Sequence, residues 1–92
     1  RLVKIHFADI LYIETMDDYL KIHVENRKPV ITLMNLKAME DKLPPKEFCR
    51  IHRSFLVRLD KINFVRNKLV NINMVEIPIG NRYEEEFNKR YL

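Results

Sequence analysis

Residues 48–57 read FCRIHRSFLV, and this stretch decides how the whole chain is interpreted. Apolar residues at both ends indicate a buried strand, yet its middle carries four side chains that can donate hydrogen bonds: Arg50, His52, Arg53 and Ser54. A buried polar group without a partner costs about 1–3 kcal/mol, and a charged group costs more. These four groups therefore either have partners inside the protein or face outward toward another molecule.

A regular strand cannot keep all the apolar residues of this stretch covered, because side chains alternate between its two faces. Phe48 and Cys49 have opposite parity, so we predict a bend or a strand end near His52. Such a break leaves Arg53 exposed and His52 at the boundary, with Arg50 as a supporting structural or phosphate partner. The apolar neighbours expected to stay covered are Ile51 and Phe55.

The chain on either side has mostly β patterns. The predicted strands are residues 9–14, 20–25, 30–33, 62–65, 69–73 and 75–79. The second of these alternates strictly between apolar and polar residues, which predicts one buried face. Its inward side chains are Leu20, Ile22 and Val24. The first two strands form a hairpin across residues 15–18, and residues 57–62 are expected to form a helical turn or a loop.

Two segments have helical periodicity instead. Leu36, Met39 and Leu43 fall on one face of a helix, Asn35 is a suitable N-cap, and two prolines follow. Residues 82–92 carry aromatic residues at steps of four, behind three glutamates that favour a helix start. The predicted fold class is therefore mainly β: a small fold of several sheets with one short central helix and a C-terminal helix.

Composition and length indicate one folded domain. The chain has 92 residues, of which 47% are hydrophobic and 33% charged, a mixture typical of globular proteins. Its apolar runs are far too short to span a bilayer, and no signal peptide is visible, so we expect a cytoplasmic protein without a membrane partner. Cys49 is the only cysteine, which excludes an intramolecular disulfide and predicts a small core residue or an inert thiol.

The positive charge is concentrated rather than spread. The net charge is +4; residues 1–48 hold eight basic and eight acidic side chains, whereas residues 50–68 hold six basic ones against Asp60 alone. Such a segment on an otherwise balanced domain is typical of a surface that meets phosphates. A solvated face that keeps the protein soluble would give the same pattern.

No pattern in the chain indicates catalysis or metal binding. His52 and Ser54 lack the third group that orients a base toward a nucleophile. His6, His23 and His52 are widely spaced and have no cysteine partner, and Gly80, the only glycine, excludes a glycine-rich phosphate loop. We therefore expect no enzyme activity, no cofactor and no metal.

Nucleic-acid binding agrees better with the residue types. Arginine makes bidentate contacts with phosphate or guanine, and His, Ser and Asn add shorter donors. Residues 50–54 and residues 81–83 both carry such sets. Two alternatives stay open at this point: a structural network in which arginine pairs with carboxylates, and a protein-interaction module whose basic face docks an acidic partner.

Several motifs follow one another along nearly the whole chain. They are ILYIE (10–14), YLKIH (19–23), TLMNL (32–36), LP (43–44), FCRIHRSFLV (48–57) and IPIGNRY (77–83). Together they resemble the LytTR (LytR/AlgR-type) DNA-binding domain of bacterial response regulators. The string F-x-R-x-H-R-S-aromatic-hydrophobic-V is the most specific of them.

This resemblance implies a mostly β domain that binds double-stranded DNA, projects loops into successive major grooves, recognises paired repeats and pairs as a dimer on DNA. It implies that residues 1–92 are the C-terminal domain of a two-component transcription regulator, with a receiver domain in the full-length chain and a cognate sensor kinase. The start at Arg1 without an initiator methionine agrees with such a fragment.

The family's DNA-facing loops correspond to residues 17–21, 52–54 and 80–83. The DNA-binding residues implied within them are Lys21, His52, Arg53, Ser54, Asn81, Arg82 and Tyr83. Arg50 and Arg58 are implied as supporting residues, with phosphate or structural roles. Two departures stand out: Arg58 replaces a common asparagine, and the acids Asp17 and Asp18 would repel phosphates unless they accept a hydrogen bond from a cytosine amino group.

Overall fold

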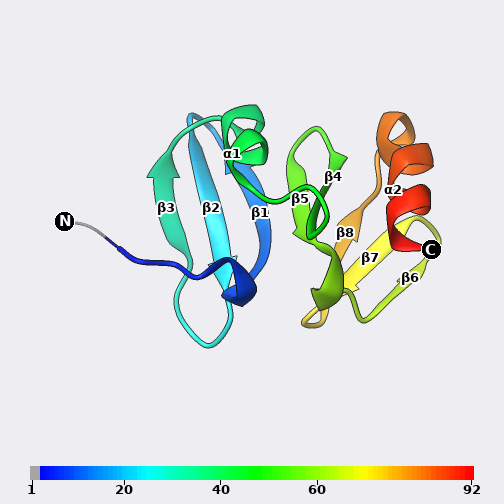
Figure 1. Ribbon diagram of the computed structural model, residues 1–92, viewed down its shortest axis with the longest axis horizontal. Helices are drawn as coiled ribbons and strands as arrows, with labels where there is room; N and C mark the ends of the chain where they lie inside the picture. Colours follow the sequence, from blue (N-terminus) through cyan, green and yellow to red (C-terminus); the bar gives the residue numbers. More distant parts are fainter. Residues whose placement is uncertain (1–2) are drawn as a thin grey trace.

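The computed structural model describes residues 3–92 and confirms the mainly β fold class (Figure 1). The strands are β1 (Ile10–Met16), β2 (Tyr19–Val24), β3 (Val30–Leu33), β4 (Phe48–His52), β5 (Phe55–Arg58), β6 (Phe64–Arg66), β7 (Leu69–Ile72) and β8 (Val75–Pro78). The helices are α1 (Leu36–Lys42) and α2 (Glu84–Tyr91), with 3-10 turns at Phe7–Asp9, Leu59–Lys61 and Asn81–Tyr83. Among the described residues, no helix is both long and apolar enough to cross a membrane.

The strands form two antiparallel sheets. The larger sheet has the order β3-β2-β1-β5-β4, and the smaller sheet has the order β6-β7-β8. In Figure 1 the smaller sheet and α2 lie beyond β4 and β5, on the side away from β3. The larger sheet therefore has α1 against one face, while part of its other face meets the smaller sheet.

The first core lies between the larger sheet and α1. Ile13 and Leu56 are fully buried on neighbouring strands and pack with Leu36 of the helix. The Asn35 side chain accepts a hydrogen bond from the Ala38 N–H at 2.8 Å, which confirms the predicted N-cap. The inward residues predicted on β2 belong to the same core: Leu20, Ile22 and Val24.

The second core joins the two sheets and α2. Tyr12 and Val57 of the larger sheet pack with Val70 and Ile77 of the smaller one, and Phe87 of α2 completes the cluster. Because α2 directly follows the 3-10 turn at Asn81–Tyr83, burial of its apolar face also fixes that turn relative to β4.

Residues 48–57 form a hairpin rather than one strand. β4 ends at His52, two residues make the turn, and the pairing register shifts between Arg50 and His52, so the predicted break is confirmed. Ile51 is fully buried, as predicted. Phe55 is only partly covered, because it is the first residue of β5 beside the turn, where its ring packs on His52 with centroids 5.4 Å apart.

Several predicted boundaries are wrong, and one of them is the start of β6, which begins at Phe64 rather than at residue 62. Residues 57–62 were expected to form a turn or loop, but β5 continues through Arg58, and only Leu59–Lys61 forms a 3-10 turn. The error arises because Arg58 resembles a solvated residue in sequence, although internal partners allow it to be buried. β1 extends two residues further than predicted, and the C-terminal helix begins at Glu84 rather than at residue 82.

The alkaline limit of stability is the first testable consequence of this packing. Cys49 is buried, as predicted for a small core residue, and burial raises the pKa of its thiol; burial, with the charge of Glu14, also raises the pKa of Tyr12. The folded state therefore holds both protons more tightly than the unfolded chain, so their contribution is complete below the ordinary thiol value of 9.0 and is lost as pH rises through the folded-state values.

Urea unfolding at increasing pH measures this effect. We expect the free energy of unfolding to decline above the ordinary thiol value, and to decline less steeply in Cys49→Ala. Equal slopes in the parent and the variant would contradict a contribution from the thiol.

Candidate nucleic-acid interface

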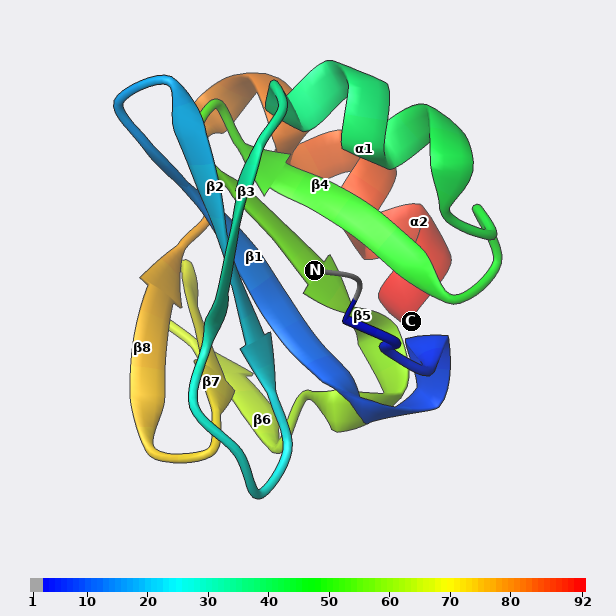
Figure 2. The same cartoon turned by 90° about the vertical axis from the view of Figure 1, so that its left-hand side faces the viewer.

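The three loops implicated by sequence lie at one end of the molecule. The β1–β2 turn, the β4–β5 turn and the segment between β8 and α2 all occupy the upper end in Figure 1 and in the rotated view of Figure 2. Two backbone hydrogen bonds connect them: the Thr15 N–H donates to the Ser54 carbonyl at 3.0 Å, and the Gly80 N–H donates to the Ile51 carbonyl at 2.7 Å. Segments far apart in sequence therefore form one continuous surface.

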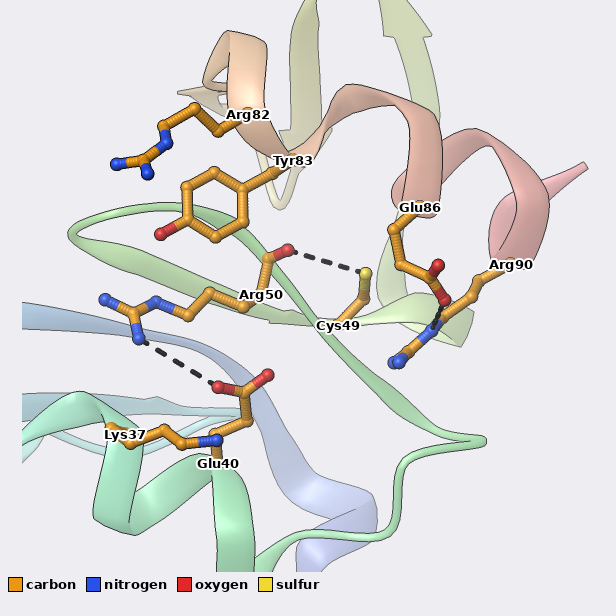
Figure 3. A pocket seen from close by; sticks show the side chains of 8 residues that line it. All are labelled: Lys37, Glu40, Cys49, Arg50, Arg82, Tyr83, Glu86 and Arg90. Carbon is orange, nitrogen blue, oxygen red and sulfur yellow. Dashed lines mark hydrogen bonds and ion pairs between the residues drawn. The ribbon is translucent and has the colours of Figure 1, made fainter.

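The Arg50 side chain stabilises the β4–β5 turn by hydrogen bonds to its backbone. Its Nε donates to the His52 carbonyl at 3.3 Å, and its Nη2 donates to the Arg53 carbonyl at 2.6 Å. Figure 3 shows the guanidinium lying between Glu40 of α1, at 3.9 Å, and the Tyr83 ring, whose centroid is 5.8 Å away. With its donors engaged by the protein, Arg50 has the supporting geometry of a residue that shapes the turn.

His52 holds the same turn with its side chain. The Ser54 N–H donates to Nδ1 of His52 at 3.0 Å, so this nitrogen is the acceptor and the Nε2 position carries the proton of the neutral ring. The His52 ring is partly buried against Phe55. His52 can therefore orient the turn and still present one donor at its rim.

Among the described residues, Arg53 and Arg82 carry the two uncommitted guanidinium groups of this surface. Both are exposed, and within residues 3–92 neither guanidinium makes a hydrogen bond or an ion pair. Figure 3 shows Arg82 extending past the Tyr83 ring and away from the ion pair of Glu86 and Arg90. A guanidinium in this state keeps all five donors for an incoming ligand.

A depression of about 250 Å³ joins the two loops. Its lining consists of five of the seven residues implied by sequence, without Lys21 and Ser54, and of one glycine: His52, Arg53, Gly80, Asn81, Arg82 and Tyr83. Gly80 has an ordinary negative φ, so its value here is its small size. A Cβ at this position would lie 3.3 Å from Tyr83 Cδ2 and 3.5 Å from His52 Cδ2, so the loops could not approach as freely.

Lys21 lies farther along the surface. In the register of the larger sheet it lies opposite Glu14 of β1 and Ile31 of β3, and it does not line the depression. Glu14 is itself bonded to His23 at 2.5 Å. Asp17, in the turn above, has a φ of 54°, a conformation that Asp tolerates better than most residues. This loop thus offers one cation and two acids, unlike the two cationic loops beside it.

Arg58 lies outside this surface and is only 7% exposed. It donates to Asp60 at 2.7 Å, to Glu47 at 2.9 Å and to the Phe7 carbonyl at 3.1 Å. Burial alone lowers its pKa, but the hydrogen bonds to Asp60 and Glu47 outweigh it and leave the pKa raised. These contacts describe a structural role, in which Arg58 joins β5 to the segments that precede β1 and β4.

Lys68 is the functional candidate that the sequence did not single out, having entered only as one of six basic residues. The structure brings it from the β6–β7 turn to the 80–83 segment, where its ammonium bonds Asn81 and lies 3.4 Å from Glu84. The signal in the sequence was the pair Asn67-Lys68 between two strands, which predicts a tight turn but does not show what the turn approaches.

The described residues contain no cluster of three or more His, Cys, Asp or Glu side chains able to hold a metal ion. The residues that line the depression are instead rich in donors: two open guanidinium groups, a histidine and an asparagine amide, together with the Tyr83 ring. Surfaces of this composition suit phosphate oxygens and the acceptor edges of bases.

Two bacterial proteins are similar to this chain along almost its whole length. The sensory transduction protein LytT of Bacillus subtilis is 29% identical over 94 residues, covering 96% of this chain and 39% of that protein. The transcriptional regulatory protein YpdB of Escherichia coli K12 is 28% identical over 96 residues, covering 97% of this chain and 39% of that protein. The chain thus spans about two fifths of the length of these relatives.

A solved structure shows the same fold. It is described as the LytTr DNA-binding domain of a putative methyl-accepting/DNA response regulator from Bacillus cereus, with a TM-score of 0.86 and 23% identity over 96% of this chain and 85% of that one. Residues 1–91 also match the family described as LytTr DNA-binding domain, which confirms the resemblance drawn from the motifs. The chain therefore belongs to the LytTr DNA-binding domain family.

Proposed function

We propose that this chain binds specific double-stranded DNA through the end that carries its three loops. The observation that carries the proposal is the pair Arg53 and Arg82: both are exposed and uncommitted, and both stand on the rim of one depression. Around them, Arg50, His52 and Gly80 fix the loops by contacts within the protein. The site is thus preorganised, with its free donors on the outside.

The division of labour follows from the chemistry of each loop. Arg53, Arg82 and Asn81 are the side chains proposed to contact bases or phosphates, while His52, Ser54 and Tyr83 shape the surface and add shorter contacts. Lys21 is proposed to meet a phosphate at the edge of the surface. Asp17 and Asp18 either stay clear of the backbone or accept from a cytosine amino group, since phosphates repel them.

The family and the relatives support a wider proposal. In it, the loops enter successive major grooves of two repeats, and two chains occupy the pair as a dimer on DNA. LytT and YpdB are named as a sensory transduction protein and a transcriptional regulatory protein and are much longer than this chain. We infer that the full-length protein carries a receiver domain answering to a sensor kinase.

Salt dependence tests the electrostatic part of this proposal. Three basic side chains of the interface can meet phosphates, Lys21, Arg53 and Arg82, and each neutralised phosphate contributes about −0.9 to the slope of log affinity against log salt. We expect a slope of about −2 to −3 in fluorescence-anisotropy titrations with a duplex that the protein selects.

The matched control is a scrambled duplex of the same length and charge, which should give a comparable slope at much weaker affinity. A slope near zero for the selected duplex would contradict binding through these cations.

A further inference from the structure

The β6–β7 turn contains a residue whose type is unexpected for its backbone conformation. Asn67 and Lys68 have φ values of 54° and 60°, the left-handed conformation of both central residues in a two-residue type I′ hairpin. Asparagine suits the first position, and glycine is the usual residue at the second. Lysine at the second position costs conformational energy that glycine would avoid.

The Lys68 backbone and side chain both hold the segment that leads into α2. The Ile79 N–H donates to the Lys68 carbonyl at 2.9 Å, which fixes the start of the segment. The Lys68 ammonium donates to Oδ1 of Asn81 and lies 3.4 Å from Oε1 of Glu84. Lys68, which lies 13 residues before Asn81 in the sequence, therefore holds the Asn81 side chain in place.

The hydrogen bond from Lys68 determines which end of the Asn81 amide is available to a ligand. A lysine ammonium has donors only, so the amide must turn its oxygen toward Lys68. The amide nitrogen carries two N–H groups and, within residues 3–92, makes no hydrogen bond. Asn81 thus presents donors to an incoming molecule, with a positive charge behind its oxygen.

This polarity distinguishes between bases. Asparagine pairs with adenine by accepting from N6 and donating to N7, which needs the oxygen and the nitrogen together. Guanine presents two acceptors, O6 and N7, at the same edge. With the Asn81 oxygen bound to Lys68, an adenine amino group would have to share that oxygen with the ammonium, whose positive charge repels a second donor. Guanine would meet only the free N–H donors of the amide.

We propose that Lys68 is a positioning residue that sets the base preference of Asn81, directing it to guanine and against adenine in the major groove. The inference rests on the proposed function, because it requires Asn81 to face DNA. It assigns a specificity role to a residue outside the three loops, acting through a side-chain contact.

Site selection from random duplexes with the 92-residue chain and its variants tests the proposal. The position that loses its preference in Asn81→Ala identifies the base pair facing Asn81. At that position we expect the parent to prefer guanine, and Lys68→Met to raise the affinity for adenine relative to guanine by about tenfold. Lys68→Arg keeps the donors and should keep the preference.

Two controls separate this effect from charge and from the ion pair. Lys89→Met removes the same charge from an exposed position on α2, and Glu84→Gln removes the ion pair while leaving the Lys68–Asn81 contact. Neither should change the base ratio, and the effect of Lys68→Met should vanish in an Asn81→Ala background.

Three results would overturn the inference: an unchanged base ratio in Lys68→Met, a loss of affinity that is uniform over all sequences and equal to that of Lys89→Met, or a changed ratio that persists without Asn81. If the parent selects no sequence at all, the proposed function fails, and the inference fails with it. If the parent selects a sequence but Lys68→Met leaves the base ratio unchanged, the inference is overturned while the proposed function stands.

Discussion

Replacing Arg53 and Arg82 together by alanine is expected to weaken specific DNA binding at least about thirtyfold. Each well-placed arginine contact contributes about 1–3 kcal/mol, and 1.4 kcal/mol is a factor of ten, so two losses combine to this size. Neither side chain bonds to the rest of the described chain, so the fold should not change. Anisotropy titrations at fixed salt with a selected duplex measure the effect.

The matched control removes two charges elsewhere. Lys42 and Lys46 are exposed, at the end of α1 and just after it, away from the three loops. The double variant Lys42→Ala/Lys46→Ala should lose far less affinity than the arginine pair. Equal losses in the two double variants, with unchanged melting temperatures, would mean that net charge rather than these loops governs binding.

The single variants assign a role to each arginine. A loss confined to the selected duplex indicates that the arginine contacts a base. A loss that is uniform across sequences, with a salt slope reduced by about one, indicates a phosphate contact. Measuring Arg53→Ala and Arg82→Ala on selected and scrambled duplexes therefore shows, for each arginine, whether it contacts a base or a phosphate.

Phe87→Ala is expected to destabilise the fold by about 3–5 kcal/mol, the range observed when a buried phenylalanine is truncated. Phe87 is 1% exposed, closes the core between the two sheets and stacks on Tyr91 with ring centroids 5.3 Å apart. For a domain of this size each kcal/mol shifts the melting temperature by about 4–8 °C, so the midpoint should fall by at least about 12 °C. Thermal unfolding followed by far-UV circular dichroism measures it.

Asn88→Ala is the neighbouring control, because Asn88 is exposed on the same helix. Its substitution should leave the midpoint within the range of an ordinary surface change, about 0.5 kcal/mol. A Phe87→Ala midpoint equal to that of Asn88→Ala would contradict the docking of α2 on the second core. That docking matters for the interface, because α2 begins where the 80–83 segment ends.

Alternation of side chains was sufficient to predict a break near His52, although not the hairpin that forms there. Phe48 and Cys49 could not share a face of one regular strand, and the structure has a register shift between Arg50 and His52 and a turn after His52. The N-cap at Asn35 and the inward face of β2 followed from equally local rules. In these three cases the rule depends only on residues close together in sequence, and sequence alone predicted the outcome.

Side-chain contacts between residues far apart in the sequence could not be predicted from sequence alone. Arg58 lies 11 residues from Glu47 and 51 from the Phe7 carbonyl that it bonds, so nothing near it in sequence marked it as buried. Lys68 and Asn81 are 13 residues apart and meet only because β7 and β8 return the chain to the same end. The motif resemblance pointed to the loops, but the partners that hold them needed the fold.

Site selection from random duplexes, followed by hydroxyl-radical footprinting on the selected sequence, tests most directly the claim that the three-loop end recognises specific DNA. We expect a recurrent motif, present as two repeats protected on one face of the duplex and separated by whole helical turns of about 10 base pairs. The Arg53→Ala/Arg82→Ala variant should fail to protect it. A parent protein that enriches no motif and protects DNA without regard to sequence would contradict the account.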